Sequence, residues 1–308
     1  MKLVDLVAEE LAQPVDPRVT ALAAEVAARH TSARAVLFYG SCLRQTALEE
    51  DALLDFYLIV ADYAQAFGKA WLALANRLLP PNVFPIEADG LAAKYAVLSE
   101  ADLSRLASAK TRNVSVWARF AQPSRLVWAA DEEARREVFA SIAQAAPALL
   151  AAARPRLPDR LPLLDMWRQA FAQTYRAELR AERRGRATTL VEPFADRYRR
   201  FSGPALEVAG LGATISHDFL TFDRPIPSAE RARAKRAWAR RRREGKALTI
   251  LRLAKASATW GTGGIDYLAW KIGRHAGQPV ELRPWQRRWP LLGAFALLPK
   301  LIARGAVR

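Results

Sequence analysis

Hydrophobic positions recur at helical spacing in two stretches near the start of the chain, Leu3 to Leu11 and Val19 to Ala28. The dipeptide Asp16-Pro17 precedes the second stretch, and an aspartate before a first-turn proline is a typical helix start. The pattern therefore predicts two helices before the first strand.

Strand patterns follow. Residues 33–39 are rich in aromatic and branched side chains and end at Gly40-Ser41, which predicts a strand followed by a turn. Residues 53–60 are too apolar for a strand with one wet face, so they predict a central strand that is buried on both sides. Two further strands are predicted at 91–98 and 125–128, with helical stretches at 64–79 and 100–121.

The second half of the chain has a different pattern. A long Ala-rich helix is predicted from Asp131 to Ala153, and it ends at three prolines within residues 154–162. Residues 164–209 are again helical, and residues 203–223 are predicted to be rich in loops. The predicted class is α+β, and the predicted parts are residues 1–155, 156–228 and 229–308.

The predicted part 229–308 is much more basic than the rest of the chain. The chain has 308 residues and a net charge of +16, and residues 229–308 hold 19 Lys and Arg against 4 Asp and Glu. Such a balance favours a polyanionic partner: nucleic acid, an anionic bilayer or a phosphate-rich substrate. The single cysteine, Cys42, excludes an internal disulfide and predicts a reducing compartment. We find neither a secretory signal nor an apolar run long enough to span a bilayer.

The candidate chemistry lies at the end of the first strand. Gly40 allows backbone N–H groups to turn toward an anion, and the Ser41 hydroxyl adds a donor, so a triphosphate could be held there. Asp55 on the next strand could bind Mg²⁺ that bridges those phosphates. A glycine-serine turn and a strand aspartate also occur with purely structural roles, so this pattern alone leaves both interpretations open.

The arrangement resembles the nucleotidyltransferase superfamily, and within it the mitochondrial-type phosphatidate cytidylyltransferases of the translocator assembly and maintenance family. The similar segments cover much of residues 35–275. They are Tyr39-Gly-Ser-Cys-Leu-Arg-Gln45, Leu54-Asp-Phe-Tyr-Leu58 with Asp62 downstream, Lys94-Tyr-Ala-Val-Leu-Ser99, Trp117-Ala-Arg119 through Pro123, Thr174-Tyr-Arg-Ala-Glu-Leu-Arg180, and Leu253-Ala-Lys255.

Three positions depart from these patterns. The second acid of the superfamily strand is replaced by Tyr57, a family glycine by Ala118, and a family lysine by Gln122. Glu178 is the expected substitute carboxylate, while the contact of the missing lysine is either lost or supplied by Arg125.

The resemblance implies a nucleotidyltransferase-fold mixed sheet with flanking helices, a smaller, mainly helical, winged-helix-like domain, and a basic amphipathic C-terminal segment. It implies that CTP and phosphatidic acid react with Mg²⁺ to give CDP-diacylglycerol and pyrophosphate. CTP, phosphatidic acid and an anionic membrane surface are the expected partners. The implied catalytic residues are Asp55, Glu178 and Lys94, with Asp55 and Glu178 on the metal and Gly40, Ser41, Gln45, Arg119 and Arg180 on the nucleotide or phosphates.

The basic C-terminal part suits a membrane surface. Eight basic residues and no acid lie between Arg231 and Arg243, and tryptophans and cations flank the short apolar run at 291–298. We expect a protein that is cytoplasmic and peripheral on the inner face of a membrane. The alternative for this part is a helix packed on the core. The expected lipid contacts are Arg240, Arg241, Arg242, Lys255, Trp285, Arg287, Arg288 and Trp289.

Other functions remain open. A nucleic-acid-directed nucleotidyltransferase would place the basic segment on a phosphodiester backbone, although we expect no nucleic-acid partner. A small-molecule nucleotidyltransferase would not require that segment. A catalytically inactive binding module would explain Tyr57 and Gln122.

Overall fold

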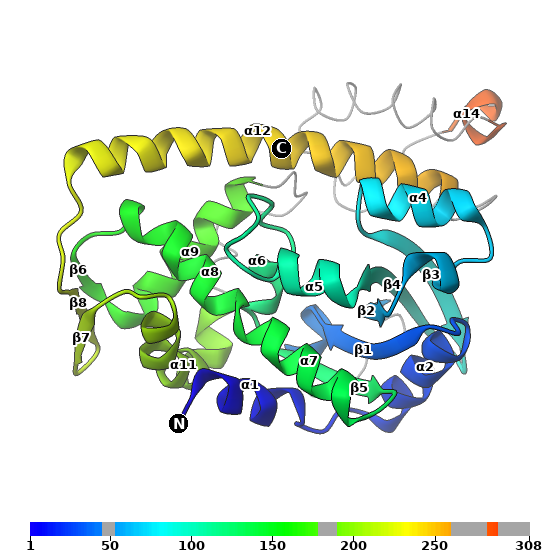
Figure 1. The fold of residues 1–308 in the computed structure, drawn as a ribbon, viewed down its shortest axis with the longest axis horizontal. Coiled ribbons are helices and arrows are strands. Elements are labelled where there is room, and N and C mark those ends of the chain that lie inside the picture. The colour runs from blue at the N-terminus through cyan, green and yellow to red at the C-terminus, as the bar shows by residue number, and fades with distance from the viewer. Residues whose placement is uncertain (45–52, 178–189, 260–281, 289–308) are drawn as a thin grey trace.

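A computed structural model describes residues 1–44, 53–177, 190–259 and 282–288 (Figure 1). The chain is α+β, as predicted: a five-stranded mixed sheet with helices on both faces lies beside a smaller module with its own short sheet. One long helix, α12, runs along one side of both parts (Figure 1).

The larger sheet has the strand order β3-β4-β2-β1-β5. Strands β2 and β4 are parallel, and the other neighbours are antiparallel. The central strand β2 is nearly completely buried, as predicted from its apolar run. The strand bounds are β1 (Ala33–Tyr39), β2 (Leu53–Val60), β3 (Asn82–Ala88), β4 (Leu91–Ser99) and β5 (Ser124–Ala129).

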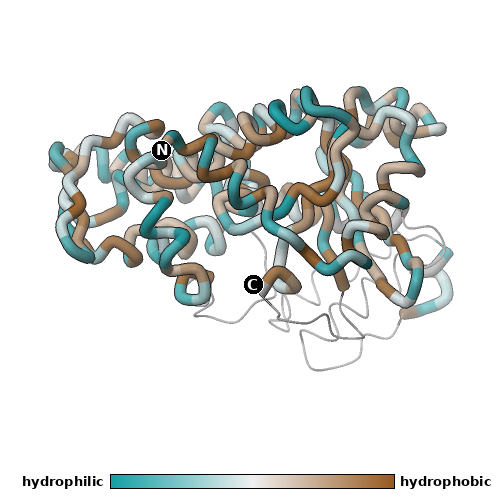
Figure 2. The backbone as a smooth tube through the Cα atoms, turned by 90° about the horizontal axis from the view of Figure 1, so that it is seen from below, coloured by the Kyte–Doolittle hydropathy of each residue, from teal (hydrophilic) through white to brown (hydrophobic). Residues whose placement is uncertain are grey.

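Helices cover both faces of this sheet. One face packs against α1 (Leu3–Leu11), α5 (Glu100–Leu106), α6 (Trp117–Phe120), α7 (Glu132–Ala143) and α8 (Ala145–Ala153). The other face packs against α2 (Pro17–Ala28), α3 (Tyr63–Ala66) and α4 (Ala70–Leu78). Along the backbone tube, hydrophobic and hydrophilic residues alternate, as expected of elements that pack one face on a core (Figure 2). The Asp16 carboxylate accepts a hydrogen bond from Arg18 N, so it caps α2 as predicted.

Several predicted helices are interrupted. The stretch 64–79 forms α3 and α4 with Gly68 between them, and the stretch 100–121 forms α5 and α6. The Ala-rich stretch breaks at Gln144, three residues before Pro147, which has no N–H to donate. Strand β3 was not predicted. It contains Pro85, which a strand tolerates here because β3 lies at the sheet edge.

The smaller module has the element order of a winged helix. Its strand β6 (Arg160–Pro162) is followed by α9 (Leu163–Ala177), α11 (Ala195–Val208) and the hairpin β7 (Ala213–Ser216) and β8 (Phe219–Phe222), and the sheet order is β6-β8-β7. Residues 203–223, which were expected to be loop, therefore hold the end of α11 and this hairpin. The turn at His217 has a positive φ of 52°, and its sequence lacks the glycine that would have signalled a hairpin.

The two parts share one hydrophobic core. A continuous cluster joins Leu37 and Tyr57 of the large sheet to Trp167, Tyr198 and Leu220 of the smaller module. The sequence boundary after residue 155 therefore does not separate two independent cores.

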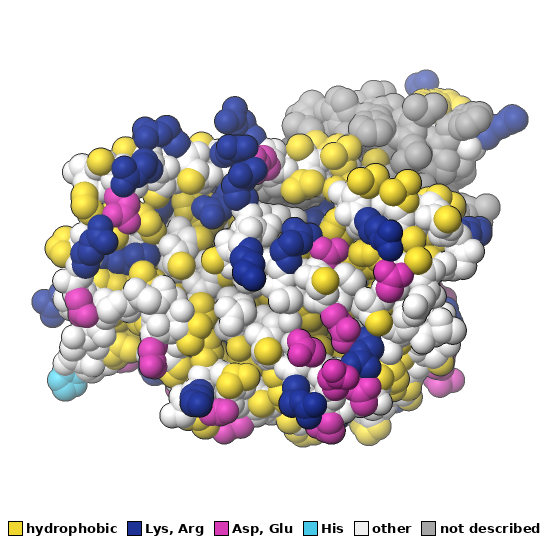
Figure 3. Space-filling view, viewed as in Figure 1, with side chains coloured by type: hydrophobic (Ala, Val, Ile, Leu, Met, Phe, Trp, Pro, Cys, Tyr) yellow, Lys and Arg dark blue, Asp and Glu magenta, His cyan; other side chains and the backbone are white. Residues whose placement is uncertain are grey.

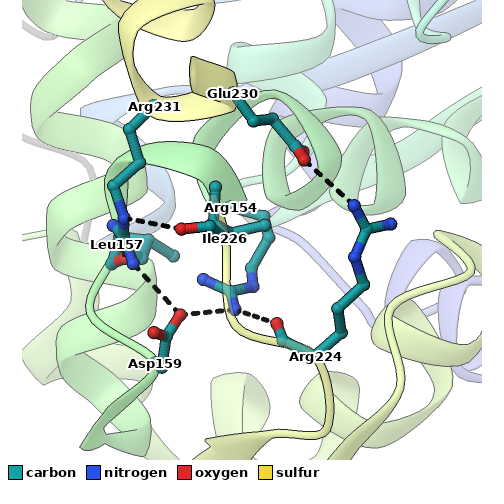
Figure 4. A network of polar contacts seen from close by, with 7 residues as sticks. All are labelled: Arg154, Leu157, Asp159, Arg224, Ile226, Glu230 and Arg231. Carbon is teal, nitrogen blue, oxygen red and sulfur yellow. Dashed lines mark hydrogen bonds and ion pairs between the residues drawn. The ribbon is translucent and has the colours of Figure 1, made fainter. Parts of the chain in front are cut away.

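Helix α12 (Ser228–Thr259) connects the smaller module to the β3 edge of the sheet (Figure 1). At its start, buried Arg154 donates hydrogen bonds to Asp159 Oδ1 and to the Arg224 carbonyl, both at 2.7 Å, and Arg231 also reaches Asp159, at 3.1 Å (Figure 4). Further along, Trp238 is 1% exposed and its Nε1 donates to the Ala152 carbonyl at 3.0 Å. The basic segment up to Thr259 is thus a helix packed along the protein. A short helix, α14 (Pro284–Arg288), follows.

Candidate functional site

The turn after β1 requires glycine for two reasons. Gly40 has a φ of +102°, which side-chain-bearing residues rarely adopt. A Cβ atom at this position would also lie 2.9 Å from Asp55 Oδ2. The Asp55 carboxylate therefore lies directly against the glycine-serine turn, as the sequence hypothesis requires. Exposed Ser41 begins the 3₁₀ helix η1 (Ser41–Arg44).

Strand register places a lysine on the other side of this carboxylate. Asp55 is the partner of Tyr39 on β1 and of Lys94 on β4. The Lys94 ammonium lies 2.8 Å from Asp55 Oδ1, and both side chains are about one-fifth exposed. Oδ1 is therefore paired with a cation, while Oδ2 faces the turn.

Tyr57 and Arg119 complete this end of the sheet. Residues 55 and 57 project from the same face of β2 because side chains alternate along a strand. The buried Tyr57 hydroxyl accepts a hydrogen bond of 2.9 Å from Arg119 Nη1. The Arg119 guanidinium also lies 5.1 Å from the centre of the Tyr39 ring, a cation–π distance. At the position where the resembled superfamily has a second acid, this chain therefore has a tyrosine whose hydroxyl contacts an arginine.

The carboxylate fits a magnesium ion. Mg²⁺ in proteins is usually bound by one or two carboxylates, with phosphates and water as its other ligands. Asp55, whose Oδ2 lies beside the Gly40 turn, could supply one such carboxylate. Among the described residues, no group of three or more His, Cys, Asp or Glu side chains could hold a metal by itself. The ion would therefore be completed by nucleotide phosphates and by a carboxylate such as Glu178.

Three of the predicted site residues lie outside the described residues: Gln45, Glu178 and Arg180. Glu178 directly follows the last described residue of α9, Ala177. The hypothesis that this carboxylate replaces the acid missing at Tyr57 therefore stays a prediction.

The other residues considered for the site have structural contacts. Asp62 lies at the opposite end of β2, where it caps α3 and pairs with Arg77, and its pKa is lowered by the hydrogen bond from the Ala64 backbone. Gln122 Nε2 donates to the Ala118 carbonyl within its own turn at 2.8 Å. Arg125, the suggested source of the missing phosphate contact, donates to Gln13 Oε1 at 2.5 Å, and burial lowers its pKa.

The predicted lipid contacts on α12 do not all face solvent. Arg240 is exposed and pairs with Glu244 at 2.6 Å. Arg241 packs over the Trp238 ring at 5.0 Å, and burial lowers its pKa. Arg242 is half-buried.

Lys255 points into the protein. Its Nζ donates a hydrogen bond to the Leu79 carbonyl, and burial lowers its pKa to about 7. On α14, Trp285 is 43% exposed and Arg288 is exposed, whereas the Arg287 side chain and Trp289 lie outside the described residues. In the part of the chain that the structure describes, no helix is both long enough and apolar enough to cross a membrane.

Tyr39 and Tyr57 belong to the site but were not among the predicted site residues. Their rings lie 5.2 Å apart. The spacing of two between Asp55 and Tyr57 signals a shared face, but only the register of β1 against β2 shows that Tyr39 joins them.

Comparison with models of known protein families finds no match for this chain, and comparison with curated proteins finds no significant match either. The resemblance to phosphatidate cytidylyltransferases therefore stays a prediction from the short sequence segments.

Proposed function

We propose that this protein is a magnesium-dependent nucleotidyltransferase that transfers a cytidylyl group from CTP to phosphatidic acid at a membrane surface. The observation that supports it most is the Asp55 carboxylate, which lies against the Gly40 turn on one side and the Lys94 ammonium on the other. An anion-binding turn, a metal-binding carboxylate and a cation are the groups that transfer of a nucleotidyl group requires.

In this reaction a phosphate oxygen of phosphatidic acid attacks the α-phosphorus of CTP. A new P–O bond forms there, and the P–O bond to the β-phosphate breaks, so pyrophosphate leaves. The nucleophile is already an anion at neutral pH, so no strong general base is required. Alignment of the two substrates and neutralisation of their charges are then the main tasks of the protein.

The residues divide these tasks. Asp55 would hold Mg²⁺, which when bound neutralises charge on the phosphates. Backbone N–H groups of the Gly40-Ser41 turn would hold the triphosphate, and Lys94 and Arg119 would contact phosphates of either substrate. The Tyr57 hydroxyl would position Arg119, because it accepts a hydrogen bond from that guanidinium.

The winged-helix-like module gives little support to a nucleic-acid substrate. Each of the three arginines of α11 is paired with an acid: Arg197 with Glu10, Arg199 with Asp196 and Asp218, and Arg200 with Glu9. A helix that binds a phosphodiester backbone needs cations that are available to phosphates.

The direct test supplies radiolabelled CTP, phosphatidic acid vesicles and Mg²⁺ to the full chain and measures labelled CDP-diacylglycerol. Asp55→Asn should lower the rate at least about a hundredfold, since it removes the charge that would hold the metal. Asp62→Asn is the control, just past the other end of β2, and it should retain the wild-type rate within about twofold because Asp62 caps α3 and pairs with Arg77, away from the candidate site.

Three results would contradict the proposal. One is the absence of lipid product from the wild type at any Mg²⁺ concentration, as expected of an inactive binding module. Another is equal activity of Asp55→Asn and the wild type. The third is transfer of the label to an oligonucleotide in place of the lipid, as expected of a nucleic-acid-directed enzyme.

A further inference from the structure

One face of α12 carries a straight stripe of arginines. Arg233, Arg236, Arg240 and Arg243 are spaced three, four and three residues apart, so they share one side of the helix. All four are exposed, whereas Trp238 and Gly245, on the opposite side, pack against the protein. We call these four residues the arginine stripe.

A group of exposed apolar side chains lies near the other end of α12. Trp71, Leu74 and Leu78 are 49%, 58% and 76% exposed and follow one stripe of α4. Leu251 of α12 is 46% exposed. Helices α4 and α12 adjoin here, because Lys255 of α12 donates to the Leu79 carbonyl at the end of α4. We call Trp71, Leu74, Leu78 and Leu251 the apolar patch.

Exposed cations flank the part of the patch that lies on α4. Lys69 and Arg77 are exposed at the two ends of this helix, and the neighbouring Asp62 is paired with Arg77. Both acids of α12 are paired: Glu230 with Arg224, and Glu244 with both Arg112 and Arg240. In Figure 3, Lys and Arg side chains gather along α12, and hydrophobic side chains cover its C-terminal half and α4.

We infer that the arginine stripe and the apolar patch form one docking surface for an anionic lipid bilayer. The arginines match the negative charge of the headgroups, and the patch suits burial at the boundary between headgroups and acyl chains. The inference rests on the proposed function in one respect: a phosphatidate-using enzyme must reach a membrane. A nucleic acid would use the arginines but would leave the exposed leucines and Trp71 without a partner.

This surface differs from the lipid contacts expected from sequence. It adds α4, which is about 160 residues away in the chain from the basic segment, and it leaves out Arg241 and Lys255, whose side chains contact the protein. The membrane would then lie along the side of the molecule that α12 forms, with α1 and α11 on the far side (Figure 1).

Cosedimentation of the full chain with vesicles tests the stripe. The vesicles contain phosphatidylcholine with or without phosphatidic acid. The triple variant R233Q/R236Q/R243Q should bind anionic vesicles about a hundredfold more weakly, since each surface cation contributes about fivefold in partitioning. The control R29Q/R136Q/R200Q removes three exposed arginines, one just after α2, one on α7 and one on α11, and should bind like the wild type.

A second pair of variants tests the patch. L74Q/L78Q should weaken vesicle binding by about tenfold per leucine at high salt, where the contribution of the arginines is screened. Val208→Gln removes an apolar side chain of α11 that is 52% exposed and should have no effect. Thermal unfolding of each variant checks that it folds.

Two results would overturn the inference: wild-type vesicle binding by both the stripe and the patch variants, or binding of oligonucleotides that exceeds vesicle binding and is insensitive to L74Q/L78Q. Transfer to a short-chain, water-soluble phosphatidate separates this inference from the proposed function. Stripe variants that lose vesicle binding but keep the soluble reaction support both. If the wild type binds vesicles but shows no transfer, and both the stripe variant and the patch variant bind vesicles more weakly, the docking surface stands and the proposed function fails.

Discussion

Arginines lie on both faces of α12, but those on the inward face contact the protein and those on the outward face are exposed to solvent. On the inward face, Arg231 donates to the Leu157 carbonyl and Arg241 packs on Trp238. On the outward face, Arg233 and Arg236 are exposed. Position on the helical repeat, and not composition, decides whether an arginine in this basic segment stabilises the fold or is available to a partner. Changes on the inward face should therefore lower stability, and changes on the outward face should not.

Trp238→Ala should cause the largest loss of stability. It removes a fully buried indole and its hydrogen bond to Ala152, so the free energy of unfolding should fall by about 3–5 kcal/mol. Denaturant unfolding measures this change. Arg236→Gln, two residues away but outward, should stay within about 0.5 kcal/mol of the wild type, and an equal loss in both variants would contradict the distinction between the faces.

Gly245→Ala should come next. A Cβ atom at residue 245 would lie 2.1 Å from the Ala177 carbonyl oxygen, so α12 and α9 would have to separate. We expect a loss of about 2 kcal/mol in denaturant unfolding, since overpacking outweighs the better helix propensity of alanine. Gly68→Ala, between α3 and α4, where an added Cβ would meet no atom of a non-neighbouring residue within 4 Å, is the control and should stay close to the wild type.

Asp159→Asn tests the start of the inward face. It leaves buried Arg154 without its carboxylate, and we expect a loss of about 1–2 kcal/mol at neutral pH. The hydrogen bond from Arg154 lowers the pKa of Asp159 below 3.8. Its stabilisation is thus complete above that ordinary pKa and is lost as the pH falls through the folded-state pKa. Unfolding curves between pH 6 and pH 2 should converge for variant and wild type at the acid end; a constant gap would contradict this assignment.

Lys255→Met should change the free energy of unfolding least at high pH. Near neutrality the change should be larger, with the methionine variant more stable than the wild type. Burial lowers the pKa of Lys255 from 10.5 to about 7, so between these values the unfolded chain binds more protons than the folded chain. Wild-type stability should therefore rise with pH from about 7 to about 10.5. The methionine variant should lack this part of the rise in unfolding experiments, and an unchanged pH profile would show that Lys255 titrates normally.

Most of the large sheet was predictable from sequence, because its strands carry strong local signals. The branched and aromatic run at 33–39 and the apolar run at 53–60 match β1 and β2. Strand β3 was missed because Pro85 weakens the strand signal, and only its pairing with β4 at the sheet edge makes the proline acceptable. The hairpin β7–β8 was missed because its turn contains His217 in place of glycine.

For the candidate site, the sequence predicted the turn, Asp55, Lys94 and Arg119 as site residues, but not the contacts that join them. The proximity of Gly40 and Asp55 follows from two adjacent strands. The pairing of Asp55 with Lys94 depends on β4 lying parallel to β2, and the contact of Arg119 with Tyr57 joins residues 62 positions apart. Such contacts depend on tertiary register, which no local pattern specifies.

The hydrophobic cluster that passes without interruption from the large sheet into the smaller module makes the protein hard to divide. A fragment that ended near residue 155 would lose α9 and α11, which pack on α8, and would expose buried side chains of α8 such as Leu149 and Leu150 to water. The described halves should therefore melt together in one calorimetric transition, and neither should be obtained as a well-behaved piece when expressed alone. The folded state of the sheet, and any activity at its candidate site, then depends on a winged-helix-like module that need not touch the substrate.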